Sequence, residues 1–108
     1  MKITIHKKTS ALSLRKILRT LQKNRDFIHS EYRITVLGIF GSYSRNEQRK
    51  KSDIDILVSY DQDATLFNKI DLKKYLESIF LVKVDLVAEK YIKPVYRDSI
   101  MSDLIKIG

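Results

Sequence analysis

Three aspartates in this chain occupy positions that suit metal-dependent chemistry. Asp53 and Asp55 lie in the stretch SDIDILV, and ten residues separate the pair Gly41-Ser42 from Asp53. Successive side chains of a strand point to opposite faces, so Asp53 and Asp55 should share one face, roughly 6.6 Å apart. Asp85 interrupts a second apolar stretch, VKVDLV, although aspartate is disfavoured in strands. If the two strands pair, the three carboxylates converge on one small region.

Converging carboxylates indicate a divalent cation. Like charges in a low-dielectric place repel each other and favour protonation, whereas a hard cation such as Mg²⁺ takes oxygen ligands of this kind. Two such ions can activate an attacking oxygen and stabilise the leaving group of a phosphoryl transfer. The pattern therefore predicts metal-assisted attack on a nucleotide α-phosphate, with Asp53, Asp55 and Asp85 as metal ligands. Taken singly, each aspartate also fits a strand end or a solvent-facing edge strand.

The pair Gly41-Ser42 is the predicted phosphate-binding turn. Glycine lets the backbone come close to a ligand, and the Ser42 hydroxyl and the following N–H groups can bond phosphate oxygens. Arg45 lies one turn further on and is expected to hold the triphosphate. A Gly-Ser pair alone is more often a plain turn. Its spacing from the aspartate pair is what favours phosphate binding here. The basic segment 47–51 is interpreted as a solvated loop.

Alternating helices and strands are expected to position these residues. Strands are predicted from apolar, β-branched stretches at residues 34–40, 53–59, 83–87 and 104–107. Helices are predicted from Ser13 onward and at residues 26–32, 66–80 and 94–101, the last one opening at Pro94. Residues 42–50 are expected to form a short helix or a helical turn. This order predicts an α/β or α+β domain of two layers.

Composition limits the chain to one domain. Its 108 residues suffice for a core but leave no room for a separate substrate domain, so residues 1–108 are expected to form one unit, with 1–10 as an arm or edge strand. The chain has no cysteine, no apolar signal core and no run long enough to span a membrane, which favours the cytoplasm. Residues 1–52 hold 13 Lys or Arg against 3 acids, a basic half that suits phosphates, nucleic acid or an acidic protein.

With the later VDLV, the segment GSYSRNEQRKKSDIDILV resembles the minimal nucleotidyltransferase (MNT) family of the polymerase-β-like nucleotidyltransferase superfamily, and within it the MntA-like antitoxins. The resemblance implies a mixed sheet flanked by helices, with ATP and two Mg²⁺ ions as ligands. It implies that Asp53 and Asp55 hold metal and that Asp85 joins them and helps to deprotonate the nucleophile. Gly41 and Ser42 would bind the triphosphate. Asn46 stands where the family often has glycine, and asparagine tolerates left-handed backbone.

Many proteins of this family are antitoxins paired with HEPN-domain ribonuclease toxins. The resemblance therefore implies transfer of AMP from ATP to a tyrosine of such a toxin, as in a type VII-like toxin–antitoxin pair. One alternative is an antitoxin without catalysis that neutralises its partner by binding. A small-molecule nucleotidyltransferase is another, and the basic half leaves a nucleic-acid-binding repressor open but not favoured.

Overall fold

The first element is a long helix, α2 (Leu14–Tyr32), in a computed structural model that describes residues 12–107. Ser13 caps it by accepting a hydrogen bond from the Lys16 N–H at 3.1 Å. The helix ends at Arg33, whose backbone is left-handed and whose N–H donates to the His29 carbonyl. The arm or edge strand expected at 1–10 lies outside the described residues.

The prediction of two helical pieces in this region was wrong, because α2 is continuous. Its buried side chains Ile17, Leu21 and Ile28 lie on one face, and none of the polar residues 22–26 between them is buried. No glycine or proline interrupts the segment. The polar residues 22–26 interrupt the apolar pattern of the helix but not its backbone.

A four-stranded mixed sheet follows, as the resemblance implied. Its strands are β1 (Ile34–Phe40), β2 (Ile54–Tyr60), β3 (Val84–Ala88) and β4 (Ile105–Lys106), in the spatial order β3-β2-β1-β4. β1 runs antiparallel to β2 and to β4, and β2 runs parallel to β3. The predicted strands at 53–59 and 83–87 each begin one residue later than expected, which leaves Asp53 just ahead of β2.

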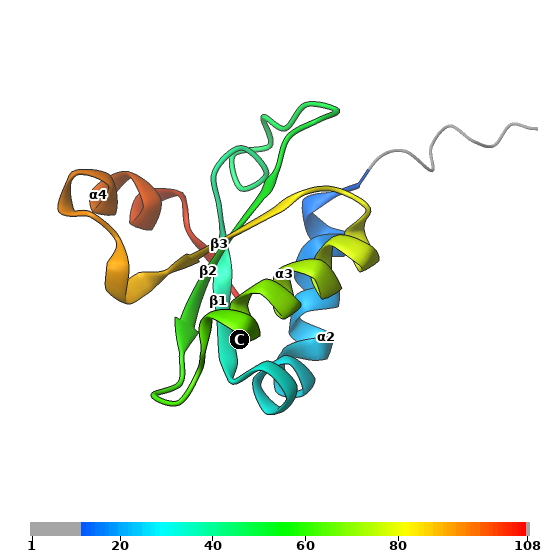
Figure 1. Ribbon diagram of the computed structural model, residues 1–108. Coiled ribbons are helices and arrows are strands. Elements are labelled where there is room, and N and C mark those ends of the chain that lie inside the picture. The colour runs from blue at the N-terminus through cyan, green and yellow to red at the C-terminus, as the bar shows by residue number, and fades with distance from the viewer. Residues whose placement is uncertain (1–11, 108) are drawn as a thin grey trace, which may run out of the picture.

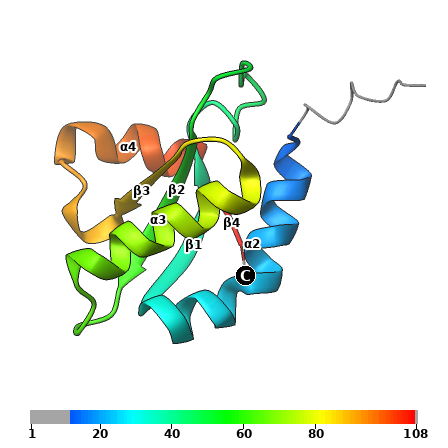
Figure 2. The same cartoon turned by 45° about the vertical axis from the view of Figure 1, so that its right-hand side comes forward.

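The parallel pair is joined by α3 (Leu66–Phe80), and the predicted range was correct to the residue. Thr65 and Asn68 form a reciprocal capping box at its start, and Leu81 ends it in a left-handed conformation. Helices α2 and α3 cover one face of the sheet, as Figures 1 and 2 show. Fully buried side chains from this interface include Ile17, Leu21, Ile28, Ile34, Ile54, Ile56 and Leu72.

Beyond β3 the chain forms a short 3-10 helix, η2 (Glu89–Tyr91), and then α4 (Pro94–Asp103). In Figure 1, α4 lies on the side of the sheet away from α2 and α3. None of the ten side chains of α4, all of them described, is buried. Within residues 12–107, none of the helices has the length and apolar character that a membrane crossing requires.

A β-bulge in β1 changes which side chains face which layer. Val36 pairs with Val58, but Gly38 pairs with Leu57, so Leu37 is an extra residue in β1. The face that a side chain occupies therefore reverses after Leu37, and Phe40 comes to lie opposite Asp55. Gly38, the residue after the bulge, has no room for a side chain. A Cβ there would stand 2.3 Å from the backbone oxygen of Ile105 in β4.

Candidate active site

Two of the predicted carboxylates are neighbours on adjacent strands. Asp55 of β2 and Asp85 of β3 are paired in the parallel register, and strands lie about 4.8 Å apart. Their side chains point away from α2 and α3, because the alternating residues Ile54 and Ile56 are the ones buried in that layer. Asp85 is exposed on a strand at the edge of the sheet. The structure thus places Asp55 and Asp85 on one face, as the alternation indicated.

Electrostatics link all three aspartates. The pKa of the Asp55 carboxyl is raised to about 6, mainly by burial and further by the charges of Asp85 and Asp53, while Arg45 opposes the rise. Asp53 itself is exposed, immediately before β2. The cost of ionising Asp55 beside two other acids is the kind of cost that a bound cation removes.

The donor set fits Mg²⁺ that arrives with a nucleotide better than Mg²⁺ held by protein alone. Within residues 12–107, no group of three or more His, Cys, Asp or Glu side chains is close enough together to hold a metal ion. Magnesium is usually bound by one or two carboxylates, with phosphate oxygens and water completing the shell. Asp55 and Asp85 supply such a pair, and Asp53 stands at its margin.

Gly41 shapes the space around Asp55. Its φ is +78°, in the left-handed region that favours glycine. A Cβ at this position would lie 2.1 Å from Oδ2 of Asp55. Gly41, which was expected to approach phosphate, therefore also leaves room for the carboxylate of Asp55. No pattern in the sequence indicated this second role.

The segment after Gly41, predicted as a short helix or a helical turn, forms a compact turn. The N–H and hydroxyl of Ser44 both donate to the Gly41 carbonyl, at 3.1 and 2.8 Å, and the Glu47 N–H donates to the Ser42 carbonyl at 2.8 Å. Asn46 takes the left-handed conformation, with φ of 58°, as expected for asparagine in place of glycine. Ser42 opens this turn, half-buried, one residue beyond Gly41.

Arg45 lies beside the carboxylates but is engaged by other acids. Its Nε donates to Glu47 at 2.9 Å, and its guanidinium also pairs with Asp103 at the end of α4. Both partners raise the pKa of Arg45. No sequence pattern indicated Asp103, which lies 58 positions after Arg45 in the chain. The ion pair attaches the end of α4 to the Gly-Ser turn.

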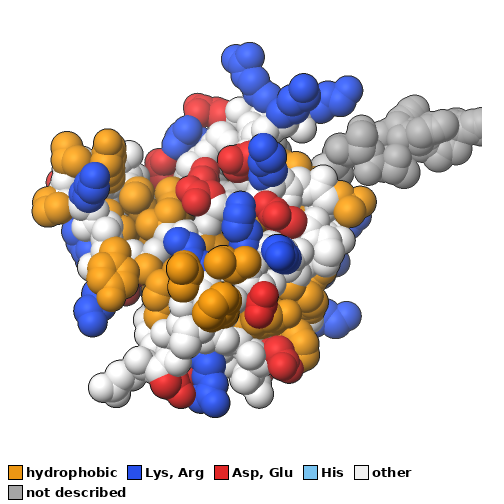
Figure 3. Space-filling view, viewed as in Figure 1, with side chains coloured by type: hydrophobic (Ala, Val, Ile, Leu, Met, Phe, Trp, Pro, Cys, Tyr) orange, Lys and Arg blue, Asp and Glu red, His pale blue; other side chains and the backbone are white. Residues whose placement is uncertain are grey.

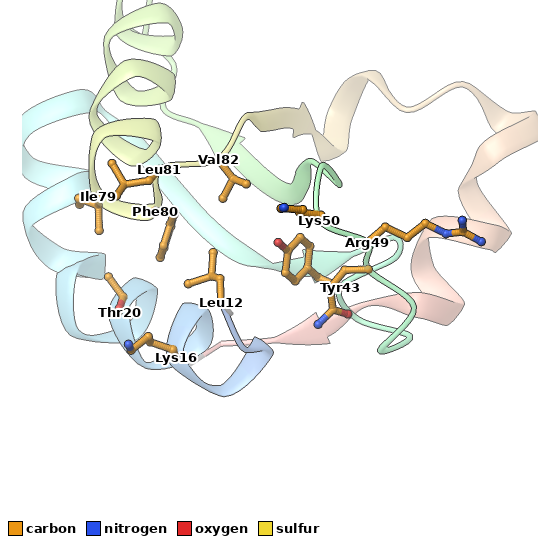
Figure 4. Close-up of a pocket in the computed structure, with 11 residues that line it drawn as sticks. Leu12, Lys16, Thr20, Tyr43, Arg49, Lys50, Ile79, Phe80, Leu81 and Val82 are labelled. Carbon is orange, nitrogen blue, oxygen red and sulfur yellow. The ribbon is translucent and has the colours of Figure 1, made fainter. Parts of the chain in front are cut away.

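A cavity of about 760 Å³ lies on the other side of this turn, between the start of α2 and the end of α3. In Figure 4, Leu12, Phe80 and Val82 point into it, whereas the Arg49 guanidinium points away. None of the three aspartates is among its lining residues. Tyr43 lines it but is only 3% exposed, because most of its ring packs in the hydrophobic core.

The chain belongs to a known enzyme family. Residues 14–107 match the family described as "Nucleotidyltransferase domain". The protein is therefore a nucleotidyltransferase, and the prediction of this class is confirmed. Its mixed sheet flanked by helices is the fold that this class was expected to have.

Individual relatives agree with this assignment. A protein of Methanocaldococcus jannaschii, named as a candidate protein adenylyltransferase (MJ0126), is 40% identical over 96 residues, which cover 88% of this chain and 98% of the relative. A solved structure named as a candidate minimal nucleotidyltransferase is 32% identical, with a TM-score of 0.65 over 82% of this chain and 93% of its own.

A third match shows the fold alone. It is a chain from the solved complex of a tri-AMPylated HEPN toxin of Shewanella oneidensis with an MNT antitoxin. Its TM-score is 0.58 and its identity 20%, over 82% of this chain and 70% of that chain.

Proposed function

We propose that this chain is a Mg²⁺-dependent protein adenylyltransferase that transfers AMP from ATP to a tyrosine of a HEPN-domain ribonuclease toxin. In this role it is the antitoxin of a type VII-like pair and acts in the cytoplasm. The nucleotidyltransferase family and the adenylyltransferase name of its relative support the reaction. The fold shared with a chain from a complex of an MNT antitoxin and an AMPylated HEPN toxin supports the partner.

The pairing of Asp55 with Asp85 beside Gly41 is the observation that carries the proposal. It brings two carboxylates to the position where the Gly-Ser turn opens, with Asp53 one residue before β2. In the proposal, Asp55 and Asp85 would hold two Mg²⁺ ions together with the phosphates of ATP, and Asp53 would join them from the margin of the pair. Bound Mg²⁺ supplies charge neutralisation and activation of the attacking oxygen.

The reaction joins the tyrosine oxygen to the α-phosphorus and breaks the bond from that phosphorus to the oxygen that bridges to the β-phosphate. Pyrophosphate leaves, and the hydroxyl proton passes to a carboxylate. Asp85 is proposed for this proton, because it is exposed on the edge strand, where another protein can reach it. Ser42 and the N–H groups of its turn are proposed to orient the triphosphate, and Arg45 to exchange an acidic partner for phosphate.

The test uses labelled ATP, Mg²⁺ and a purified HEPN-domain ribonuclease toxin. Wild type is expected to label the toxin on tyrosine, located by mass spectrometry. Asp55→Asn and Asp85→Asn should each lower the rate at least about 100-fold, because losing even an outer-shell group costs metal sites 10–100-fold. Asp26→Asn, on the exposed side of α2, is the matched control and should label like wild type.

Absence of label with wild type, or equal labelling by Asp55→Asn, refutes catalysis by this site. A toxin that is neutralised in cells by the Asp55→Asn, Asp85→Asn double variant as well as by wild type would instead favour the antitoxin that acts by binding alone.

A further inference from the structure

We propose that the surface along the free edge of β3 is where the acceptor protein docks, an inference that rests on the proposed function. We call it the β3-edge surface and define it by five side chains: Leu66 and Phe67 at the start of α3, Tyr91 in η2, and Val95 and Tyr96 in α4. Each of the five is 58–78% exposed. In Figure 3, hydrophobic side chains gather over α4 and η2 and over the first turns of α3. Clustered exposed apolar side chains mark interaction sites in soluble proteins.

The exposure of α4 indicates that another protein covers this helix. Isolated helices shorter than about 12–15 residues are marginal in water, and α4 has ten residues of which none is buried. The Arg45–Asp103 ion pair attaches its end to the Gly-Ser turn. Its outward apolar side chains Val95 and Tyr96 gain stability only when another surface buries them.

A pocket within this surface suits an anchoring side chain. It measures about 450 Å³ and lies between the start of α3, the end of β3 and η2, with Leu66, Leu86 and Tyr91 in its wall. The hydroxyl of Tyr60, also in the wall, is buried and has no hydrogen-bond partner among the described residues. Buried polar groups are almost always paired. An apolar or aromatic anchor with a polar group beside it would fill the pocket and satisfy Tyr60.

The β3-edge surface is continuous with the candidate active site. Asp85 and the pocket residue Ala88 both lie on β3, about 10 Å apart along the strand and on opposite faces of the sheet. Among the described strands, β3 pairs with β2 alone, so its other edge is open to a docking protein. A protein that docks along this open edge can contact the pocket on one face of the sheet and Asp85 on the other, where a tyrosine hydroxyl has to arrive.

Charge favours an acidic partner over a second copy of this chain. Four cations accompany the surface, namely Lys69 in the pocket wall and Lys90, Lys93 and Arg97 in the segment 89–98. The acids of that segment are Glu89 and Asp98. A symmetric dimer would set this basic rim against itself, whereas an acceptor with an acidic rim is attracted to it.

The test compares two leucines at opposite ends of α3. Leu66 is 69% exposed inside the β3-edge surface, and Leu81 is 85% exposed outside it. The affinity of a purified HEPN-domain ribonuclease toxin would be measured for wild type, Leu66→Ser, Tyr91→Ser and Leu81→Ser. Leu66→Ser and Tyr91→Ser should each weaken binding at least about tenfold. Leu81→Ser should stay within about twofold of wild type.

Three other results would each refute the docking surface, the proposed function or both. If wild type binds and labels the toxin but Leu66→Ser and Tyr91→Ser bind equally well, the docking surface is refuted while the proposed function stands. If wild type neither binds nor labels, the proposed function fails and the docking surface fails with it. If wild type sediments as a dimer that Leu66→Ser dissociates, the surface belongs to a second copy and the inference is overturned.

Tyr60→Phe gives an independent readout that a folding defect does not mimic. Removing a buried hydroxyl that lacks a partner should leave the melting temperature of the free protein unchanged or higher. The same change should weaken toxin binding several-fold. Unchanged affinity would count against Tyr60 as a contact of the anchor.

Discussion

Replacing Asp55 by asparagine should stabilise the metal-free protein at neutral pH, because the native structure half-buries this carboxylate and holds it beside two others. The pKa of Asp55 rises from 3.8 to about 6, with burial as the main cause and Asp85 and Asp53 next. At about 1.36 kcal/mol per pKa unit, that rise corresponds to about 3 kcal/mol. Asp55 is only half-buried and water screens part of the effect, so about 1–2 kcal/mol is expected.

The sign of the pH dependence follows from proton binding. Between pH 3.8 and about 6 the native state holds more protons on Asp55 than the unfolded state does, so stability falls as the pH rises through this window. Above about pH 6 the full cost is present, and below pH 3.8 it is absent. Asp55→Asn removes the charge, and its advantage over wild type should therefore appear at pH 7 and vanish near pH 4.

Urea unfolding in the presence of a chelator measures this difference. At pH 7 the variant should have the larger free energy of unfolding and melt roughly 5–10 °C above wild type. Asp26→Asn, an exposed aspartate on α2, is the control and should change stability by less than about 0.5 kcal/mol. A variant that is no more stable than wild type at pH 7, or equally more stable at pH 4, would refute the electrostatic account of the site.

Three further changes probe the neighbourhood of this carboxylate. Gly41→Ala places a Cβ 2.1 Å from Asp55 Oδ2 and strains a φ of +78°, so it should cost at least about 1–2 kcal/mol in thermal unfolding and reduce AMP transfer; wild-type values for both would contradict the packing described. Gly38→Ala meets the backbone oxygen of Ile105 at 2.3 Å and should release β4, seen as faster amide exchange there, and unchanged protection would count against it. Arg45→Ala removes the cation that lowers the pKa of Asp55, so that pKa should rise above about 6 in a carboxyl NMR titration; a lower value would be inconsistent with the site.

Local features of the sequence predicted most of the secondary structure. The helix 66–80 and the strand 34–40 were correct to the residue, because the apolar spacing of each is regular and Gly41 bounds the strand clearly. The prediction that α2 is divided into two helices was wrong, because the polar residues 22–26 interrupt its apolar pattern but not its backbone. The segment 42–50 forms turns, since its hydrogen bonds close onto Gly41 and Ser42 and do not propagate as a helix.

The candidate site was predictable only as far as it depends on local alternation. Asp103 approaches Arg45 across 58 residues, and the pocket beside Tyr60 is built from three separate elements. Neither leaves a periodic trace in the sequence. The glycine at position 38 did carry a signal, because glycine within a strand often marks a bulge or a close approach of backbone.

The sequence by itself determined that Asp55 lies on the face of its strand opposite to Ile54 and Ile56, since side-chain alternation is a property of a single strand. Tertiary structure decided what lies beside it. The parallel register sets Asp85 next to Asp55, and the extra residue Leu37 turns Phe40 toward Asp55. Register and bulge are fixed by contacts between strands that are distant in sequence, and such contacts form only when the whole sheet packs against its helices.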